Sequence, residues 1–351
     1  MLLLAFVPVT SAQVTVGPDT LRLSLPTGAE TEATLAVTNE GSGTLALYGV
    51  PLPADGLTGT PGEMLLASAP GAAYDPYDLT STDDGRLFVA EYQGGIEPET
   101  QEYSPDLALV GAFPHPEVGS DSFTGAVAWM PPGHAPEGHP EGTLWWLDRA
   151  SSFAGGTWRL EHALLLEGAL DGTPTGCAID ITHAVGPGAS NWDSGIPTGL
   201  AFDDEAAGGA GLFYYIDAIN EDIWAVGIDG TVAAGYPIPL SDYDPGTPLS
   251  MAEAGLDASR GEDGGAYFDL PLALPGEGAY SRVVVTDRFG RNTGAETPLT
   301  LLEPPDGAGQ ITRPEGVVRS RLDPSVLCLP LPPHSLNFLG DRFQLLQASG
   351  I

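Results

Sequence analysis

Residues 196–230 read IPTGLAFDDEAAGGAGLFYYIDAINEDIWAVGIDG, and this stretch is the most informative about the fold class. It holds three short runs rich in apolar residues, at 196–203, 211–217 and 222–228. Glycine and acidic residues separate the first two runs, and an Asp-Gly pair follows the third. Short β-favouring runs with turn residues between them are typical of antiparallel strands joined by hairpins. The stretch therefore predicts three consecutive strands.

The same pattern of a strand, a glycine-containing turn and an apolar strand ending in an acid recurs along the chain. The further copies span 76–91, 124–148 and 266–287. The acids that end the apolar strands lie 57, 69 and 70 residues apart, and they are Glu91, Asp148, Asp217 and Asp287. Repeats of about 40–50 residues, each a small antiparallel sheet, are typical of β-propellers, so the longer intervals here indicate inserted loops. We therefore expect an all-β propeller over residues 74–310.

Residues 196–230 resemble a blade of the NHL-type and gluconolactonase-like propellers, which are six-bladed and TolB-like. The blades of that family follow the pattern P-N-G-L-A-F, then G-x-L-Y-V-x-D, then a final D-G, and residues 74–92 look like a second such blade. The resemblance implies six blades, whereas four repeats are visible. Either two blades have diverged, the N-terminal strands contribute one, or the chain is a fragment.

The same resemblance implies one enzymatic alternative, a divalent-metal-dependent hydrolase of the lactonase type. Such enzymes hold the metal in the central channel with a Glu, an Asn and an Asp. In this chain Thr198 stands where the family has the Asn, and Thr124 and Tyr77 stand at the corresponding positions of the other repeats. A neutral hydroxyl is a poor ligand for a hard cation. The sequence therefore favours a non-catalytic binding protein and names no reaction.

Two groups of acids could form sites. Asp217, Asn220 and Asp222 have the spacing D-x-x-N-x-D and could hold Ca²⁺ through oxygen ligands, although so many acids also make chance clusters. The strand-end acids, Glu91, Asp148, Asp217 and Asp287, could form an anionic ring at the channel. Acids in this position more often accept hydrogen bonds from the backbone of the next turn, and we favour that structural role.

The first part of the chain carries a different strand pattern. Residues 23–47 read LSLPTGAETEATLAVTNEGSGTLAL, with apolar and polar residues alternating on either side of a glycine-containing turn. This resembles the start of the immunoglobulin-like modules of bacterial surface proteins, so residues 13–55 are interpreted as a partial immunoglobulin-like β segment. Such modules act as spacers, which makes a structural spacer of a surface protein a further alternative. The Pro-, Gly- and Ala-rich residues 56–73 predict a linker.

Residues 1–12 have the features of a signal peptide, since an apolar run over Leu2–Val9 precedes small residues. The run is too short to cross a bilayer, and no other segment is apolar enough to do so. We therefore expect no membrane span and a secreted or cell-surface location.

The charge of the chain is strongly one-sided. Asp and Glu number 47 against 12 Lys and Arg, giving a formal net charge of −35, and every basic residue is Arg. Nucleic acid is therefore excluded as a partner, because phosphate binding needs clustered Lys and Arg. An acidic surface without lysine fits a protein that stays soluble in high salt, although a GC-rich genome also replaces Lys with Arg. The remaining partner classes are a small molecule, a carbohydrate or a protein.

The tail, residues 311–351, differs from the rest because four Arg outnumber three acids there. We interpret it either as a segment of separate origin or as a frame-disturbed end of the reading frame. The two cysteines, Cys177 and Cys328, fit no metal-binding pattern. In an exported protein they could form one disulfide, and two unpaired thiols are an equal alternative.

Overall fold

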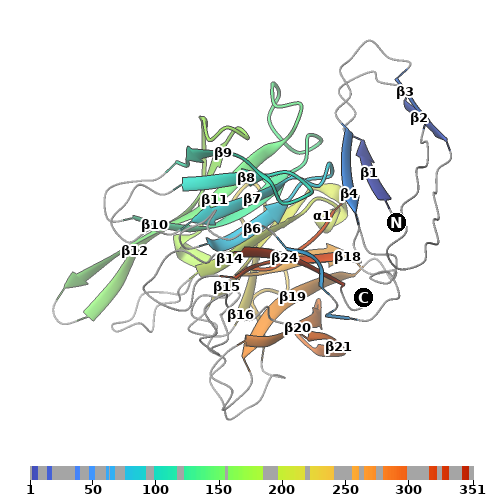
Figure 1. Cartoon of the computed structure of the whole chain (residues 1–351). Helices are drawn as coiled ribbons and strands as arrows, with labels where there is room; N and C mark the ends of the chain where they lie inside the picture. Colours follow the sequence, from blue (N-terminus) through green and yellow to red (C-terminus); the bar gives the residue numbers. More distant parts are fainter. Residues whose placement is uncertain are drawn as a thin grey trace.

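The fold comes from a computed structural model, which describes residues 2–6, 14–17, 36–39, 47–51, 61–62, 64–67, 76–91, 99–116, 122–154, 157–184, 197–217, 222–240, 255–260, 265–273, 280–298, 316–321, 326–331 and 342–347. These residues are almost all in strands and turns (Figure 1). Their one α-helix is the short α1 (Ala206–Gly209), and a single 3-10 turn spans Thr182–Ala184. The expected all-β class is therefore confirmed.

Most described strands belong to antiparallel sheets of four strands. In the first three sheets the strands follow the chain from one edge to the other. The first sheet holds β6 (Pro76–Ser81), β7 (Leu87–Glu91), β8 (Glu99–Tyr103) and β9 (Leu109–Pro114). The second holds β10 (Ser122–Met130), β11 (Thr143–Ala154), β12 (Thr157–Gly168) and β13 (Pro174–Asp180). The third holds β14 (Pro197–Asp203), β15 (Leu212–Asp217), β16 (Asp222–Val226) and β17 (Ile238–Pro239).

The last two sheets differ from what the sequence pattern predicted. The fourth consists of β18 (Asp257–Arg260), β19 (Ala266–Ala273), β20 (Tyr280–Asp287) and β21 (Asn292–Pro298). Its first strand is thus β18, and the repeat expected at 266–287 supplies the second and third strands. The fifth combines β22 (Val318–Arg319), β23 (Val326–Leu331) and β24 (Arg342–Gln347) with β5 (Met64–Ala67).

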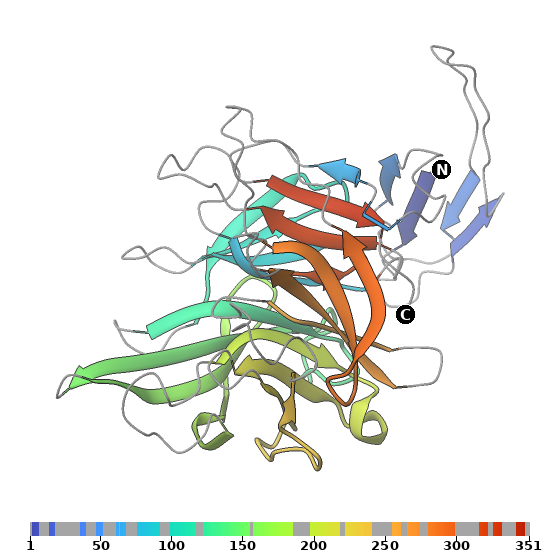
Figure 2. The same cartoon turned by 90° about the horizontal axis from the view of Figure 1, so that it is seen from below.

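The fifth sheet joins the two ends of the expected propeller region. Strand β5 pairs antiparallel with β24, with Leu66 opposite Leu345. Seen from below, the red C-terminal strands lie beside this blue strand (Figure 2). Residues 56–73, expected to be a linker, and residues 311–351, expected to be a separate segment, therefore both supply strands to the sheet. The physical reason is that backbone pairing with β5 completes the edge of β24.

The first strands of the five sheets form a closed ring. Strand β6 contacts β10, β10 contacts β14, β14 contacts β18, β18 contacts β22, and β22 contacts β6. Sheets that meet in this way at their first strands have a β-propeller arrangement around a central channel. The propeller expected from the repeats is therefore present, whereas the six blades implied by the resemblance are not confirmed.

The core lies between neighbouring sheets and explains the apolar run at 212–216. Phe213 and Tyr215 face the second sheet, where Trp145 lies 5.0 Å from Phe213 between ring centroids. Tyr214 and Ile216 point the other way, toward Phe268 of the fourth sheet. Both faces of β15 are thus buried, so its residues are apolar without a polar alternation. Further apolar clusters lie between the first and second sheets and between the fourth and fifth.

The N-terminal residues that the structure describes form two small sheets. Strand β1 (Leu2–Phe6) pairs with β4 (Leu47–Pro51), and β2 (Val14–Gly17) pairs with β3 (Ala36–Asn39). This arrangement does not confirm the immunoglobulin-like segment. Among the described residues, no helix has the length and apolar character needed to cross a membrane.

Candidate functional site

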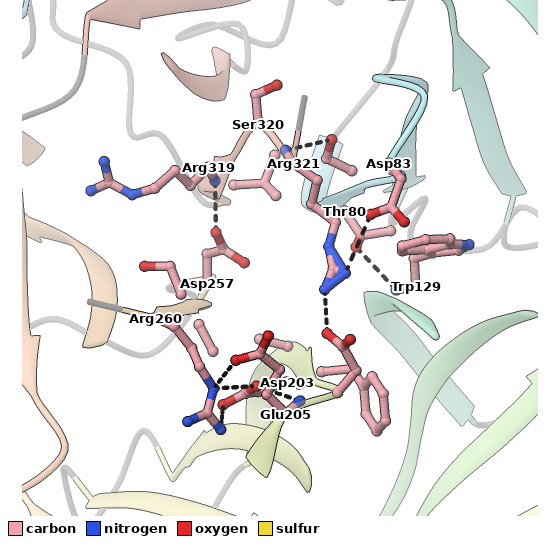
Figure 3. A pocket seen from close by; sticks show the side chains of 17 residues that line it. Thr80, Asp83, Trp129, Asp203, Glu205, Asp257, Arg260, Arg319, Ser320 and Arg321 are labelled. Atoms are coloured by element: carbon pink, nitrogen blue, oxygen red, sulfur yellow. Dashed lines mark hydrogen bonds and ion pairs between the residues drawn. The ribbon is translucent and has the colours of Figure 1, made fainter. Parts of the chain in front are cut away.

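A cavity of about 290 Å³ lies where the ring of first strands ends (Figure 3). All five sheets contribute to its wall, each through its first strand or the turn that follows. The lining residues are Thr80, Ser81, Asp83, Trp129, Ala201, Phe202, Asp203, Asp204, Glu205, Asp257, Ala258, Ser259, Arg260, Val318, Arg319, Ser320 and Arg321. The cavity therefore lies at one mouth of the central channel. Its volume is near the lower end of pockets that hold small molecules.

Charged side chains dominate this cavity. Its lining holds five carboxylates and three guanidinium groups, a formal charge of −2. Three of the 12 basic residues of the whole chain thus gather here. Arg319 and Arg321 come from the tail, whose excess of Arg was the sequence signal for this site. The pattern could not place them, because the strand that carries them was not predicted.

Arg260 joins the third and fourth sheets. Its Nε and Nη2 atoms donate hydrogen bonds to the two carboxylate oxygens of Asp203, at 3.0 and 2.8 Å. Its Nε also lies 3.4 Å from the exposed carboxylate of Glu205. A bidentate pair of this kind fixes the orientation of both side chains. One wall of the cavity is therefore pre-organised.

Arg319 joins the fourth and fifth sheets through a bidentate pair with Asp269, and this pair is buried. Its Nε donates to Asp269 at 2.9 Å and its Nη2 at 2.6 Å, with side-chain exposures of 3% and 0%. The backbone N–H of Arg319 donates to Oδ2 of Asp257 at 2.7 Å. Asp257 is thereby held at the inner end of the cavity, where it is half-buried. Burial, and next the negative charge of Asp269, raise the pKa of Asp257 to about 7.

Arg321 lies across the mouth of the cavity (Figure 3). Its guanidinium carbon is 4.9 Å from the ring centroid of Trp129, a cation–π geometry. Its Nη2 lies 2.9 Å from Asp204, and its Nη1 lies 3.9 Å from Asp83. The Trp129 indole is itself oriented, because Nε1 donates to the carbonyl of Glu141 at 3.1 Å. At the mouth, the guanidinium group of Arg321 therefore lies between an aromatic ring and carboxylates.

Deeper in the channel, Asp78 connects three first strands. Its Oδ2 accepts hydrogen bonds from the backbone N–H groups of Val127 on β10, at 3.3 Å, and Leu200 on β14, at 3.0 Å. The register of β10 shifts just before Val127, and that of β14 shifts across Leu200. Gly199, within the second shift, has a φ of 60° that suits glycine. Asp78 is 0% exposed, and its Oδ1 has no hydrogen-bond partner. Burial raises the pKa of this carboxyl well above its usual range.

The predicted strand-end acids lie elsewhere. In the strand register, Glu91, Asp148 and Asp217 are opposite Pro76, Thr124 and Pro197, near the starts of the first strands. These three acids therefore share one level, at the end of the channel away from the cavity. Asp148 lies 3.0 Å from Nε2 of His162.

Asp287 does not share that level, since it ends the third strand of its sheet. Its Oδ1 accepts the backbone N–H groups of Phe289, at 2.8 Å, and Arg291, at 3.0 Å. This is the turn-stabilising geometry that the sequence analysis favoured for acids at strand ends.

The predicted calcium loop is only partly described. Asp217 and Asp222 are opposite each other in the register of β15 and β16, and Asn220 lies outside the described residues. Within the part of the chain that the structure describes, no three His, Cys, Asp or Glu side chains gather as a metal site would require. Calcium at this loop remains a prediction.

Thr198, which stands where the lactonases have a metal ligand, is buried on β14, and its Oγ1 has no hydrogen-bond partner. Tyr77 and Thr124 lie near the starts of β6 and β10. The cysteines are both free thiols, with Cys177 exposed on β13 and Cys328 buried on β23.

The chain was compared with known proteins. A scan against protein-family models finds no match, and a search of the curated proteins finds none either. Among solved structures, the chain is similar to regucalcin, a calcium-binding protein from Agrobacterium tumefaciens, at 16% identity and a TM-score of 0.38, over 84% of this chain and 94% of that one. It is also similar to a GH43 endo-arabinanase from Bacillus licheniformis, at 14% identity and a TM-score of 0.42, over 80% and 96%. The virginiamycin B lyase from Staphylococcus aureus matches at 11% identity and a TM-score of 0.34, over 99% of both chains. At identities and TM-scores this low, the similarities carry no argument about activity or substrate.

Proposed function

We propose that this chain is a ligand-binding β-propeller that holds a small polar molecule in the cavity at its channel mouth. The observation that carries the proposal is the composition of the cavity wall. All five first strands meet there, and three arginines are fixed by carboxylates in a chain that is otherwise poor in basic residues. Small-molecule sites are typically concave and largely pre-formed, with a few oriented polar groups, and this cavity has those features.

We further propose that the protein has five blades, with β5 completing the last one, and that it acts outside the cytoplasm in a saline medium. The pairing of β5 with β24 supports the first point. The signal-like residues 1–12 and a net charge of −35 support the other two. The spacer alternative does not account for a structured cavity.

The binding proposal is tested by filling the cavity. Ala258 lines it and is half-buried, so Ala258→Trp places an indole inside. Ala178, exposed on strand β13, provides the matched control Ala178→Trp. A thermal-shift screen of monosaccharides, amino acids, amines and lactones should give compounds that raise the Tm of the native chain and of the control.

Those shifts should disappear in Ala258→Trp. Compounds that stabilise Ala258→Trp as well as the native chain would place binding elsewhere, and a library without any stabilising compound would argue against a binding role. Hydrolysis of a lactone in the same screen would instead favour the enzymatic alternative.

A further inference from the structure

The lining of the cavity offers more hydrogen-bond acceptors and more negative charge than its own arginines match. Arg260 is paired with Asp203 and Arg321 with Asp204, while Arg319 is paired with Asp269 behind the wall. Two further lining carboxylates share these arginines, since Glu205 lies 3.4 Å from Arg260 and Asp83 lies 3.9 Å from Arg321. The fifth, Asp257, accepts the backbone N–H of Arg319. An anionic ligand would add to this excess and would be repelled.

The inner end of the cavity holds a carboxylate and a hydroxyl with hydrogen-bonding capacity to spare. Asp257 has one oxygen held by the backbone N–H of Arg319 and is half-buried beside the cavity. The neighbouring Ser259 has a buried Oγ without a hydrogen-bond partner. A ligand that reaches this end can donate to both groups, and an ionised Asp257 can only accept.

A second, independent observation comes from Asp78, below the cavity floor. Thr80 lines the cavity and accepts the backbone N–H of Trp129, and Asp78 accepts the N–H of Val127, two residues earlier on the same neighbouring strand. Asp78 and Thr80 thus lie on one face of β6, with Asp78 one step deeper. The fully buried carboxyl of Asp78 leaves Oδ1 without a partner. An unpartnered carboxyl oxygen therefore lies further along the channel axis, although the raised pKa of Asp78 favours its neutral form.

We propose that the cavity selects a small organic cation, whose ammonium group donates hydrogen bonds to Asp257 and Ser259. A neutral polyol would supply donors but no positive charge, and the nearby guanidinium groups of Arg319 and Arg321 are already paired with Asp269 and Asp204. The groups at the mouth already accommodate one cation of the chain itself, since the guanidinium of Arg321 lies over Trp129 and pairs with Asp204. The inference rests on the proposed function and narrows it to a ligand class.

The test uses three probes of one length that differ in charge, 1,4-diaminobutane, 1,4-butanediol and succinate, together with glucose. Each is titrated into the full chain at pH 8 by calorimetry. We expect the diamine to bind at least tenfold more tightly than the other three. Asp257→Asn should weaken the diamine at least tenfold, because it removes the charge and keeps the shape. Glu137→Gln, an equal charge change on an exposed loop, is the control and should bind as the native chain does.

A pH profile separates a direct role of Asp257 from a merely structural one. The charged groups around this carboxyl are Asp78, Asp269, Arg319 and Arg321. Since a bound ammonium requires an ionised Asp257, diamine affinity should rise between pH 6 and pH 8 in the native chain. It should be flat over that range in Asp257→Asn.

The outcomes are distinct. Tight binding of glucose or butanediol that is lost in Asp257→Asn would overturn the cation class and leave the proposed function standing. Diamine binding that Asp257→Asn does not weaken would overturn the assignment to this cavity. No diamine binding at millimolar concentration overturns the cation class, and the screen with Ala258→Trp then shows whether the proposed function fails with it.

Discussion

The buried carboxyl of Asp78 accepts backbone hydrogen bonds from two other sheets. Its removal should show how much these bonds contribute to the stability of the ring of first strands. Asp78→Ala leaves the backbone N–H groups of Val127 and Leu200 without their acceptor. We expect a loss of about 2–5 kcal/mol in the free energy of unfolding, since each unsatisfied buried donor costs about 1–3 kcal/mol. Asp78→Asn keeps an acceptor oxygen and should cost clearly less. Chemical denaturation measures both, and equal losses in the two variants would contradict the role of Asp78 as an acceptor.

Asp257 should make stability depend on pH. Its pKa is raised to about 7 in the folded chain, whereas an unfolded Asp titrates at about 3.9. The folded chain therefore binds more protons than the unfolded chain between these values, so stability should fall as the pH rises from 4 to 7. Asp78 shifts in the same direction.

The pH effect is measured as the denaturation midpoint at pH 5 and pH 8. In Asp257→Asn the difference between the two midpoints should shrink, while Glu137→Gln should keep it. A native chain that is more stable at pH 8 than at pH 5, with the same profile in Asp257→Asn, would show that folding does not raise the pKa of this carboxyl.

Strand β22 is short, since only two of its residues form the ladder and one of them is Arg319. Arg319 contacts the fourth sheet twice, through its buried ion pair with Asp269 and through the hydrogen bond from its backbone N–H to Asp257. Arg319→Ala should cost about 3–5 kcal/mol, because it leaves a buried carboxylate without its partner. The double change Arg319→Met with Asp269→Leu should recover most of that loss.

The exposed pair of Arg282 and Glu296 on β20 and β21 provides the comparison. Arg282→Ala should cost less than about 1 kcal/mol, as exposed ion pairs usually do. Denaturant titrations of the variants would reject the proposed importance of β22 if Arg319→Ala and Arg282→Ala cost the same.

The elements also show what could be predicted from the sequence. The third sheet was found because both faces of β15 are buried between sheets, which makes Leu212–Ile216 continuously apolar. Strand β18, with the sequence DASR, was missed because it lines a polar cavity and has no apolar face to give a period. Strand β5 was missed because its partner lies at the other end of the chain, and pairing across such a distance leaves no local signal.

The same reasons limited the prediction of the site. Asp257, Arg319 and Arg321 all come from the missed strands β18 and β22 or the turn after them. The acids that the repeat pattern did single out, such as Asp148 and Asp217, lie at the opposite end of the first strands. A repeat reveals positions that are alike in every blade, whereas this cavity is built from side chains that differ between blades.

At the scale of the whole molecule, the net charge of −35 should make stability depend on salt. Self-repulsion of so many carboxylates disfavours the compact state, and added ions screen it within about 3 Å at 1 M salt. We expect the Tm to rise when KCl is raised from 0.1 to 2 M. A Tm that stays constant or falls over this range would indicate that the acidity is not an adaptation to a saline medium.

The channel mouth bounded by Trp129, Asp257 and Arg321 is the proposed binding site. A crystal structure of the chain soaked with the tightest-binding compound of the screen would locate the ligand. We predict ligand density inside this cavity, within hydrogen-bond distance of the Asp257 carboxylate. Density at the other end of the channel, beside Thr198 and Asp217, with the mouth unchanged, would contradict the account.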